Sequence, residues 1–181
     1  KTVAWTISKA ALTVTAGDAS VTFPQAAPAL TASYSGFVGT EDKTVLGGTL
    51  SLDCDYDGTV YAATFAITPS GLTSDNYEIT FKAGTLTVSK ASVTAPAAET
   101  LTYNGSEQTG VLAGTGYTLS GNTGTDARDY NATATLVDGY IWSDDTTAAK
   151  TVAWTISKAA LTVTAGDETV TFPQLPELTA D

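Results

Sequence analysis

The chain has 181 residues and a formal net charge of −11 at pH 7. This acidic balance argues against a nucleic-acid-binding protein, because such proteins need clustered lysine and arginine to displace the counterions of phosphates. With one cysteine and no histidine or methionine, the sequence offers no disulfide framework, no histidine metal site and no serine–histidine or cysteine–histidine nucleophile pair.

An exact internal repeat organises the chain. The segment KTVAWTISKAALTVTAGD at 1–18 recurs at 150–167, an offset of 149 positions. The tripeptide Ser-Lys-Ala, at 8–10, 89–91 and 157–159, divides this period into two alternating modules, as in tandem repeat proteins, and suggests a window on a longer chain. We predict the last strand of a short module at 1–9, a long module at 10–90, a short module at 91–158 and the start of the next long module at 159–181.

Period-two alternation predicts about six short strands in the long module. Apolar residues alternate there with threonine, serine and aspartate, a pattern that turns one side of each strand toward a core. A turn is expected at Asp57-Gly58, and one helical turn at 70–77. The predicted strands cover 12–16, 30–34, 49–56, 60–69, 77–81 and 85–89.

The short module repeats this logic with fewer residues. Strands are expected within 92–96, 101–111, 116–121, 130–142 and 150–157, with a tight hairpin turn at Asn104-Gly105 and core anchors at Tyr117, Tyr140, Trp142 and Trp154. The predicted fold class is all-β: tandem small β-sandwich or β-grasp-like modules arranged as an elongated rod. The rod follows from the joins, which lack a Gly/Ser-rich or Pro-rich linker.

The long module closes with GLTSDNYEITFKAGTLTVSKA, and the short module that follows runs from LTYNGSEQTGV to KTVAWTISKA. This pairing resembles the mostly-β, glycine-rich (MBG-type, Ig-like) repeat modules of large bacterial surface proteins and adhesins. That resemblance implies an extracellular location at the bacterial cell surface and stalk or adhesion repeats without catalytic residues. The stretch from Asp126 to Asp129 departs from the pattern, because a glycine-containing turn is expected there.

We expect no enzymatic activity. The stretch GTGYTLSG at 114–121 lacks the third glycine of a dinucleotide-binding loop and does not open a helix. The carboxylate pairs Glu41-Asp42 and Asp144-Asp145 lie in polar, turn-like sequence where water keeps them ionised, and no apolar pocket is evident to raise one pKa for acid catalysis.

A calcium site is the one metal hypothesis that the sequence offers. Asp53, Asp55 and Asp57 form a D-x-D-x-D-G string like the start of a calcium loop, but Thr64 stands where that loop needs a bidentate glutamate. The alternation around Cys54 instead predicts a strand with these aspartates outside and the cysteine as a small buried hydrophobe. No other cofactor is expected.

Lys9, Lys90 and Lys158 each continue the apolar phase of the strand before them. In surface proteins such a lysine sometimes closes an isopeptide bond to asparagine or aspartate, and Lys90 and Lys158 are the candidates here. The alternative is that each lysine lays its aliphatic stem over a module junction and keeps its amine in water.

Three functions remain open, all structural or binding roles. The first is a stiff stalk or spacer of an extracellular surface protein. The second is a set of repeats that bind a glycan or host protein by avidity; Tyr61, Tyr130 and Tyr140 are the candidate binding residues, and the alternative is that they pack in the core. The third is a filament-forming subunit. The expected partners are neighbouring modules, other copies in a fibre, or a host or cell-surface glycan or protein, without nucleic acid and without membrane insertion.

Overall fold

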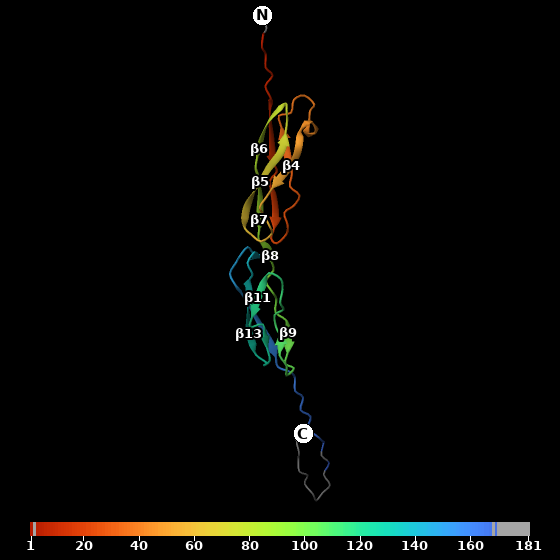
Figure 1. The fold of residues 1–181 in the computed structure, drawn as a ribbon. Coiled ribbons are helices and arrows are strands. Elements are labelled where there is room, and N and C mark those ends of the chain that lie inside the picture. Colours follow the sequence, from red (N-terminus) through yellow and green to blue (C-terminus); the bar gives the residue numbers. More distant parts are fainter. Residues whose placement is uncertain (2, 168, 170–181) are drawn as a thin grey trace. The chain divides into compact units, whose positions relative to one another are not determined.

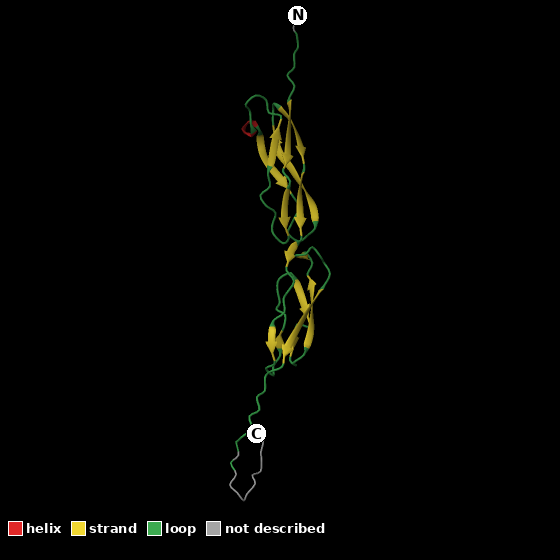
Figure 2. Ribbon diagram, turned by 180° about the vertical axis from the view of Figure 1, so that it is seen from behind, coloured by secondary structure: helices red, strands yellow, loops and turns green. Residues whose placement is uncertain are grey.

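The computed structural model describes residues 1, 3–167 and 169, and its regular structure is almost entirely β-strand (Figure 1, Figure 2). Within those residues, the helical structure is one 3₁₀ turn, η1 (Lys43–Val45). The all-β class is therefore confirmed. None of the described helical structure is long and apolar enough to cross a membrane.

The helical turn predicted at 70–77 is wrong. Residues up to Thr73 belong to β5 (Ala63–Thr73), and β6 begins at Tyr77. The helical turn lies instead at η1, where the Asp42 side chain accepts a hydrogen bond from the backbone N–H of Thr44 at 2.8 Å and caps the turn.

The chain divides into two compact units. Unit 1 combines residues 1–95 with 114–118 and 135–150, and unit 2 combines 96–113 and 119–134 with the residues from 151 onward. These units follow contacts in space, whereas the predicted modules follow the sequence repeat, so the module boundaries stay a prediction. Of the predicted next module at 159–181, all but 159–167 and 169 lies outside the described residues.

Residues 10–89 of unit 1 form two β-sheets. The first has the strand order β3-β1-β6 and the second the order β2-β7-β5-β4. The next strand, β8 (Ala91–Val93), pairs in parallel with β14 (Tyr140–Trp142). The bounds of the strands not yet given are β1 (Ala10–Ala16), β2 (Ala19–Thr22), β3 (Ala32–Ser35), β4 (Gly47–Asp53), β6 (Tyr77–Lys82) and β7 (Gly84–Ser89).

The first and last segments of this fold run parallel in one register. β1 pairs with β6 from Ala10 opposite Tyr77, and β2 pairs with β7 from Ala19 opposite Leu86, so both pairings share an offset of 67 residues. Residues 10–22 therefore lie alongside residues 77–89 over their whole length. Both segments begin in the first sheet and continue in the second.

The crossing between the sheets depends on Gly84 and Asp18. A Cβ at Gly84 would lie 2.6 Å from the carbonyl oxygen of Ala16 and 2.8 Å from that of Gly17, which leaves no room for a side chain. The carboxylate of Asp18 accepts a hydrogen bond from the backbone N–H of Thr85 at 2.8 Å and holds the two crossing segments together.

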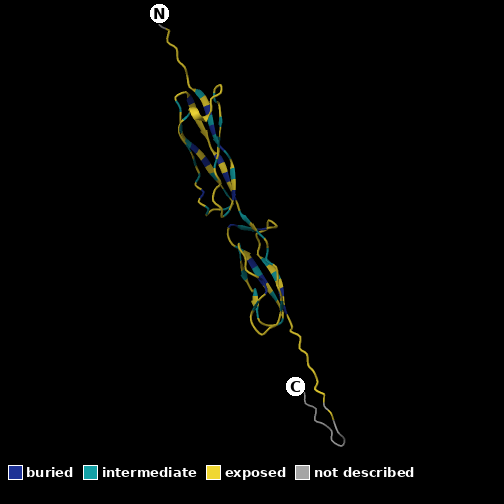
Figure 3. Ribbon diagram, turned by 90° about the vertical axis from the view of Figure 1, so that its right-hand side faces the viewer, coloured by how far each residue is buried: buried dark blue, intermediate teal, exposed yellow. Residues whose placement is uncertain are grey.

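A shared core lies between the two sheets of unit 1, which is the sandwich alternative of the predicted fold. It joins Ala16 of β1 to Ile67 of β5 and Leu86 of β7. Tyr56, which follows β4, is 9% exposed, and its hydroxyl donates a hydrogen bond to the carbonyl of Gln25 at 3.0 Å. Buried and exposed residues alternate along the strands in Figure 3, as the period-two pattern predicts. Cys54 is half-buried beside this core.

The remaining strands form a four-stranded sheet, β11-β13-β15-β9, and a two-stranded sheet, β10-β12. β15 runs parallel to β9, with Ile156 opposite Leu101. The chain reverses at the predicted turn of Asn104-Gly105, where Gly105 has a positive φ of 79°: Ala98 forms an antiparallel bridge with Val111, and the N–H of Glu99 donates to the carbonyl of Gly110 at 2.8 Å. Nearer the turn, β9 and β10 belong to different sheets. The strand bounds are β9 (Thr100–Thr102), β10 (Gln108–Thr109), β11 (Tyr117–Ser120), β12 (Thr123–Gly124), β13 (Asp129–Leu136) and β15 (Lys150–Ser157).

Trp154 of β15 is the centre of the unit 2 core. Its indole is 3% exposed, stacks on the ring of Tyr130 with centroids 4.3 Å apart, and donates a hydrogen bond to the carbonyl of Gly121 at 3.0 Å. Gly110 faces the indole so closely that a Cβ there would lie 1.8 Å from a ring atom. The other predicted core tryptophan, Trp142, is fully buried in unit 1, while Tyr117 and Tyr140 are half-buried.

Candidate functional site

Three loops share an Asp-x-Thr turn in which the aspartate carboxylate accepts hydrogen bonds from both the backbone N–H and the hydroxyl of the threonine two residues later. In each loop the carboxylate has a pKa below its ordinary value: at Asp42 and Asp57 these hydrogen bonds favour the ionised form, and at Asp144 a contact with Lys150 contributes most. The carboxylates serve as turn acceptors and are poor proton donors. The pairs are Asp42 with Thr44, Asp57 with Thr59, and Asp144 with Thr146.

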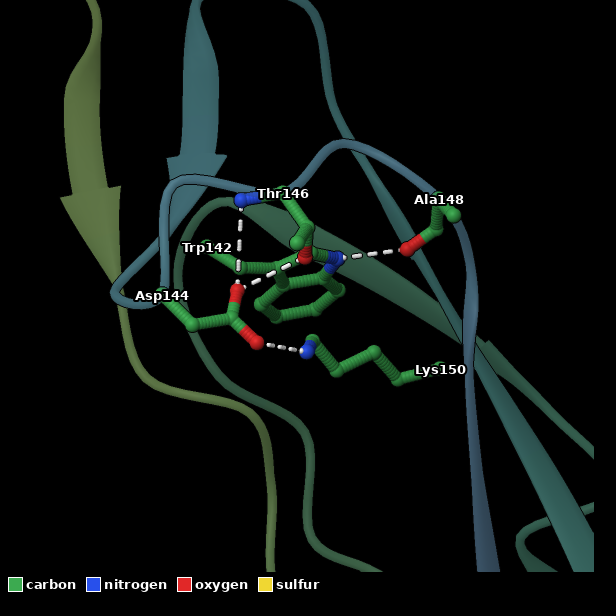
Figure 4. Close-up of polar contacts among 5 residues, drawn as sticks. All are labelled: Trp142, Asp144, Thr146, Ala148 and Lys150. Atoms are coloured by element: carbon green, nitrogen blue, oxygen red, sulfur yellow. Dashed lines mark hydrogen bonds and ion pairs between the residues drawn. The ribbon is translucent and has the colours of Figure 1, made fainter.

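The Asp144 turn is the most elaborate of the three and closes over the indole of Trp142 (Figure 4). One carboxylate oxygen of Asp144 contacts Thr146, and the other lies 2.5 Å from Nζ of Lys150. The ammonium group of Lys150 and the threonine hydroxyl together lower the pKa of Asp144 to about 2. Trp142 Nε1 donates a hydrogen bond to the carbonyl of Ala148 at 2.8 Å. The cluster holds residues 142–150 in place.

The three aspartates of the calcium hypothesis do not share one arrangement. Asp57 is engaged by its own threonine turn, and Asp53 accepts a hydrogen bond from the hydroxyl of Ser51 at 3.0 Å. Asp55 is exposed. Among the residues that the structure describes, no group of three or more carboxylate, cysteine or histidine side chains is placed to hold a metal ion.

The three junction lysines make different noncovalent contacts. Lys9 donates a hydrogen bond to the carbonyl of Ser74 at 2.8 Å, and Lys90 is half-buried with Nζ 5.5 Å from the centroid of the Tyr61 ring. Lys158 is exposed. Lys90 therefore covers an aromatic ring at the end of β7, while the isopeptide hypothesis for Lys90 and Lys158 stays a prediction.

An aromatic cluster surrounds the end of β7. The Phe23 ring meets Tyr61 edge-on at 5.5 Å and Tyr140 edge-on at 6.3 Å between centroids. Gly139 lies against the same ring, since a Cβ there would be 2.3 Å from it. Tyr61 and Tyr140, which the sequence offers as binding residues, thus pack within unit 1. Phe23 lies in the pentapeptide VTFPQ at 21–25, whose recurrence at 170–174 is a signal in the sequence, although this second copy lies outside the described residues.

The third candidate tyrosine, Tyr130, is also engaged. One face of its ring stacks on Trp154, and the guanidinium of Arg128 lies 4.6 Å from the ring centroid. Its hydroxyl accepts a hydrogen bond from the backbone N–H of Asp126 and donates one to the carbonyl of the same residue. Tyr130 therefore closes the turn at 126–129 in which the sequence lacks a glycine.

The family comparison concerns the two-sheet fold of unit 1. Residues 12–87 match the family model of the MBG domain, YGX type. This segment is an MBG domain. The match extends from β1 to β7 and includes both sheets of the sandwich, which confirms the mostly-β, glycine-rich family suggested by the sequence. No curated protein matches the chain. The MBG domain supports the assignment of this region as a repeat module of surface proteins.

Proposed function

We propose that the chain is a stiff spacer segment of an extracellular bacterial surface protein, in which repeated modules set the distance between other parts. The main observation behind the proposal is the absence of a linker where the chain leaves the MBG domain. β7 ends at Ser89 and β8 begins at Ala91, so Lys90 alone separates two hydrogen-bonded strands. A flexible linker needs several residues free of such pairing.

Side-chain packing also holds the chain in place where it leaves the MBG domain. Phe23 of the MBG domain packs on Tyr140, a residue of the predicted short module, and Lys90 covers Tyr61 at the end of β7. The backbone N–H of Ala91 also donates a hydrogen bond to the carbonyl of Gly139 at 2.9 Å. Bending at residue 90 would break these contacts together, which favours a fixed joint.

Composition and repeat length support the same role. Near-identical units joined in this way give a length that grows with copy number. The charge of −11 favours solubility and mutual repulsion, and a single cysteine with no methionine limits damage by oxidants outside the cell. The tyrosines offered for ligand binding are used in packing, so we place the multivalent-binding role second.

Small-angle X-ray scattering on arrays of one, two and three copies of residues 10–158 tests the spacer role. The maximum dimension should rise linearly, by roughly 30 Å per module at about 3.3 Å per strand residue. The matched control replaces Lys90 with a five-residue Gly/Ser linker in each copy and should give a broader, shorter distribution. A compact array, or no difference between the two series, would contradict the proposal.

A further inference from the structure

A polar groove of about 630 Å³ lies in unit 1, where the outer face of β5 and β7 meets the segment that follows β14. Its volume is in the range of roughly 300–1,000 Å³ that small-molecule sites occupy. The groove is lined by residues 62–64 at the start of β5, residues 87–90 at the end of β7, Ile141 and Asp145. None of the tyrosines offered by the sequence for ligand binding belongs to this lining.

Two residues that line the groove have an unusual backbone conformation. Ala62 has a φ of 52° and Asp145 a φ of 60°, and among the described residues they are the only non-glycine residues with a positive φ. L-residues avoid this region for steric reasons, and alanine has no polar side chain that could compensate locally. Residues held in this way cluster at ligand sites. Their meeting in one groove, from distant parts of the sequence, points to a binding site.

The floor of the groove offers side chains to a ligand. Thr64 of β5 lies opposite Thr87 of β7, and both threonines are exposed. The backbone of β7 is used within the sheet, because β7 pairs with β2 on one side and with β5 on the other. This floor therefore lacks the free strand edge to which an extended peptide adds, and a ligand is recognised there mainly through hydroxyl groups.

The charged groups of the groove are balanced. Lys90 supplies one ammonium group, which lies 5.5 Å from the centroid of the Tyr61 ring, and Asp145 supplies one carboxylate. A strongly anionic ligand would also meet the net charge of −11 of the whole chain. The groove is therefore suited to a neutral ligand that is rich in hydroxyl groups.

We propose that this groove binds a neutral oligosaccharide of N-acetylhexosamine units. An acetamido group carries an N–H donor, a carbonyl acceptor and a methyl group, which match the Asp145 carboxylate, the Lys90 ammonium group and the Ile141 side chain. The sugar hydroxyls would pair with Thr64 and Thr87, whose hydroxyls both donate and accept. The proposal goes beyond the spacer role and does not depend on it.

NMR titration of the complete chain with tri-N-acetylchitotriose tests the proposal. We expect saturable shifts confined to the amides of residues 62–64, 87–90, 141 and 145. Cellotriose is the matched probe, because it has the same linkage and ring but no acetamido group, and it should bind at least about tenfold more weakly. The deacetylated trimer is cationic and tests for unspecific attraction to the acidic chain; it should leave these amides unshifted.

Substitutions locate the site. Thr64→Val combined with Thr87→Val keeps two β-branched side chains but removes both hydroxyls, and Asp145→Gly removes the carboxylate while glycine accepts the positive φ. Each variant should weaken binding by about tenfold. The matched control is Thr13→Val combined with Thr80→Val, a facing pair in the other sheet, which should bind like the unchanged chain.

Four results would overturn the proposal. These are the absence of a saturable shift with tri-N-acetylchitotriose, equal binding of cellotriose or of the deacetylated trimer, shifts that lie outside the groove, and equal binding by the groove variants and the control pair. The amide signals of each variant outside the groove report whether its fold is intact, and the titrations of the unchanged chain decide the question independently of every variant.

Discussion

Gly110→Ala is the substitution with the most direct structural consequence in unit 2. The added Cβ would lie 1.8 Å, 2.1 Å and 2.5 Å from three ring atoms of Trp154, all far inside van der Waals contact. Gly110 is not among the residues with a positive φ, so the expected effect is steric and does not involve backbone strain. The indole must therefore move.

The magnitude follows from what the indole loses. Overpacking a well-packed core costs about 1–3 kcal/mol. Displacement also weakens the hydrogen bond from Trp154 to Gly121 and the stacking on Tyr130, and a hydrogen bond of this kind contributes about 1 kcal/mol. We expect Gly110→Ala to lower the free energy of unfolding of unit 2 by about 2–4 kcal/mol.

Equilibrium urea unfolding, followed by near-ultraviolet circular dichroism and tryptophan emission, measures this change. Gly166→Ala is the matched control, because a Cβ at Gly166 meets no atom within 4 Å. A loss within about 0.5 kcal/mol of that control would refute the reasoning. Combining Gly110→Ala with Trp154→Val tests the mechanism, since removing the ring should abolish most of the penalty of the added methyl group.

Two further predictions concern unit 1 and its neighbouring segment. Leu86→Ala should lower the free energy of unfolding by about 2–5 kcal/mol in urea titrations, because Leu86 is fully buried, whereas Leu161→Ala, at an 88% exposed position, should change it by less than about 0.5 kcal/mol. The carboxyl of Asp144, observed by NMR, should titrate near pH 2. This folded-state pKa lies below the ordinary value of 3.8. The stability that the contact with Lys150 contributes is therefore present above about pH 4 and is lost as the pH falls through 2. Titration near 3.8 would contradict this, and Asp144→Asn should remove the dependence.

The sequence was a good guide to strands and faces and a poor guide to strand partners. Alternation predicts that strand 49–56 turns one side toward a core, and Tyr56 at its end is buried. Alternation carries no information about which distant strand lies alongside, so the shared register of residues 10–22 with 77–89 was not predicted. The turn at Asn104-Gly105 could be predicted because a turn signal fixes local dihedrals, whereas the sheets that β9 and β10 join depend on the whole fold.

The polar sites were predictable in part. The Asp-x-Thr spacing is visible in the sequence and is typical of side-chain-capped turns, so the role of Asp57 could have been recognised without a structure. The aromatic cluster around Phe23 could not, because Tyr61 and Tyr140 are distant in sequence and only the fold brings them together.

The common register of the first and last segments of the MBG domain determines how the domain would respond to tension. A pull that separates residue 10 from residue 89 slides β1 along β6 and β2 along β7, because these strands run in the same direction. The hydrogen bonds of both pairs then carry the load in shear at the same time, whereas strands peeled from one end would lose them singly. The arrangement is that of a mechanical clamp between the two points where force enters the domain.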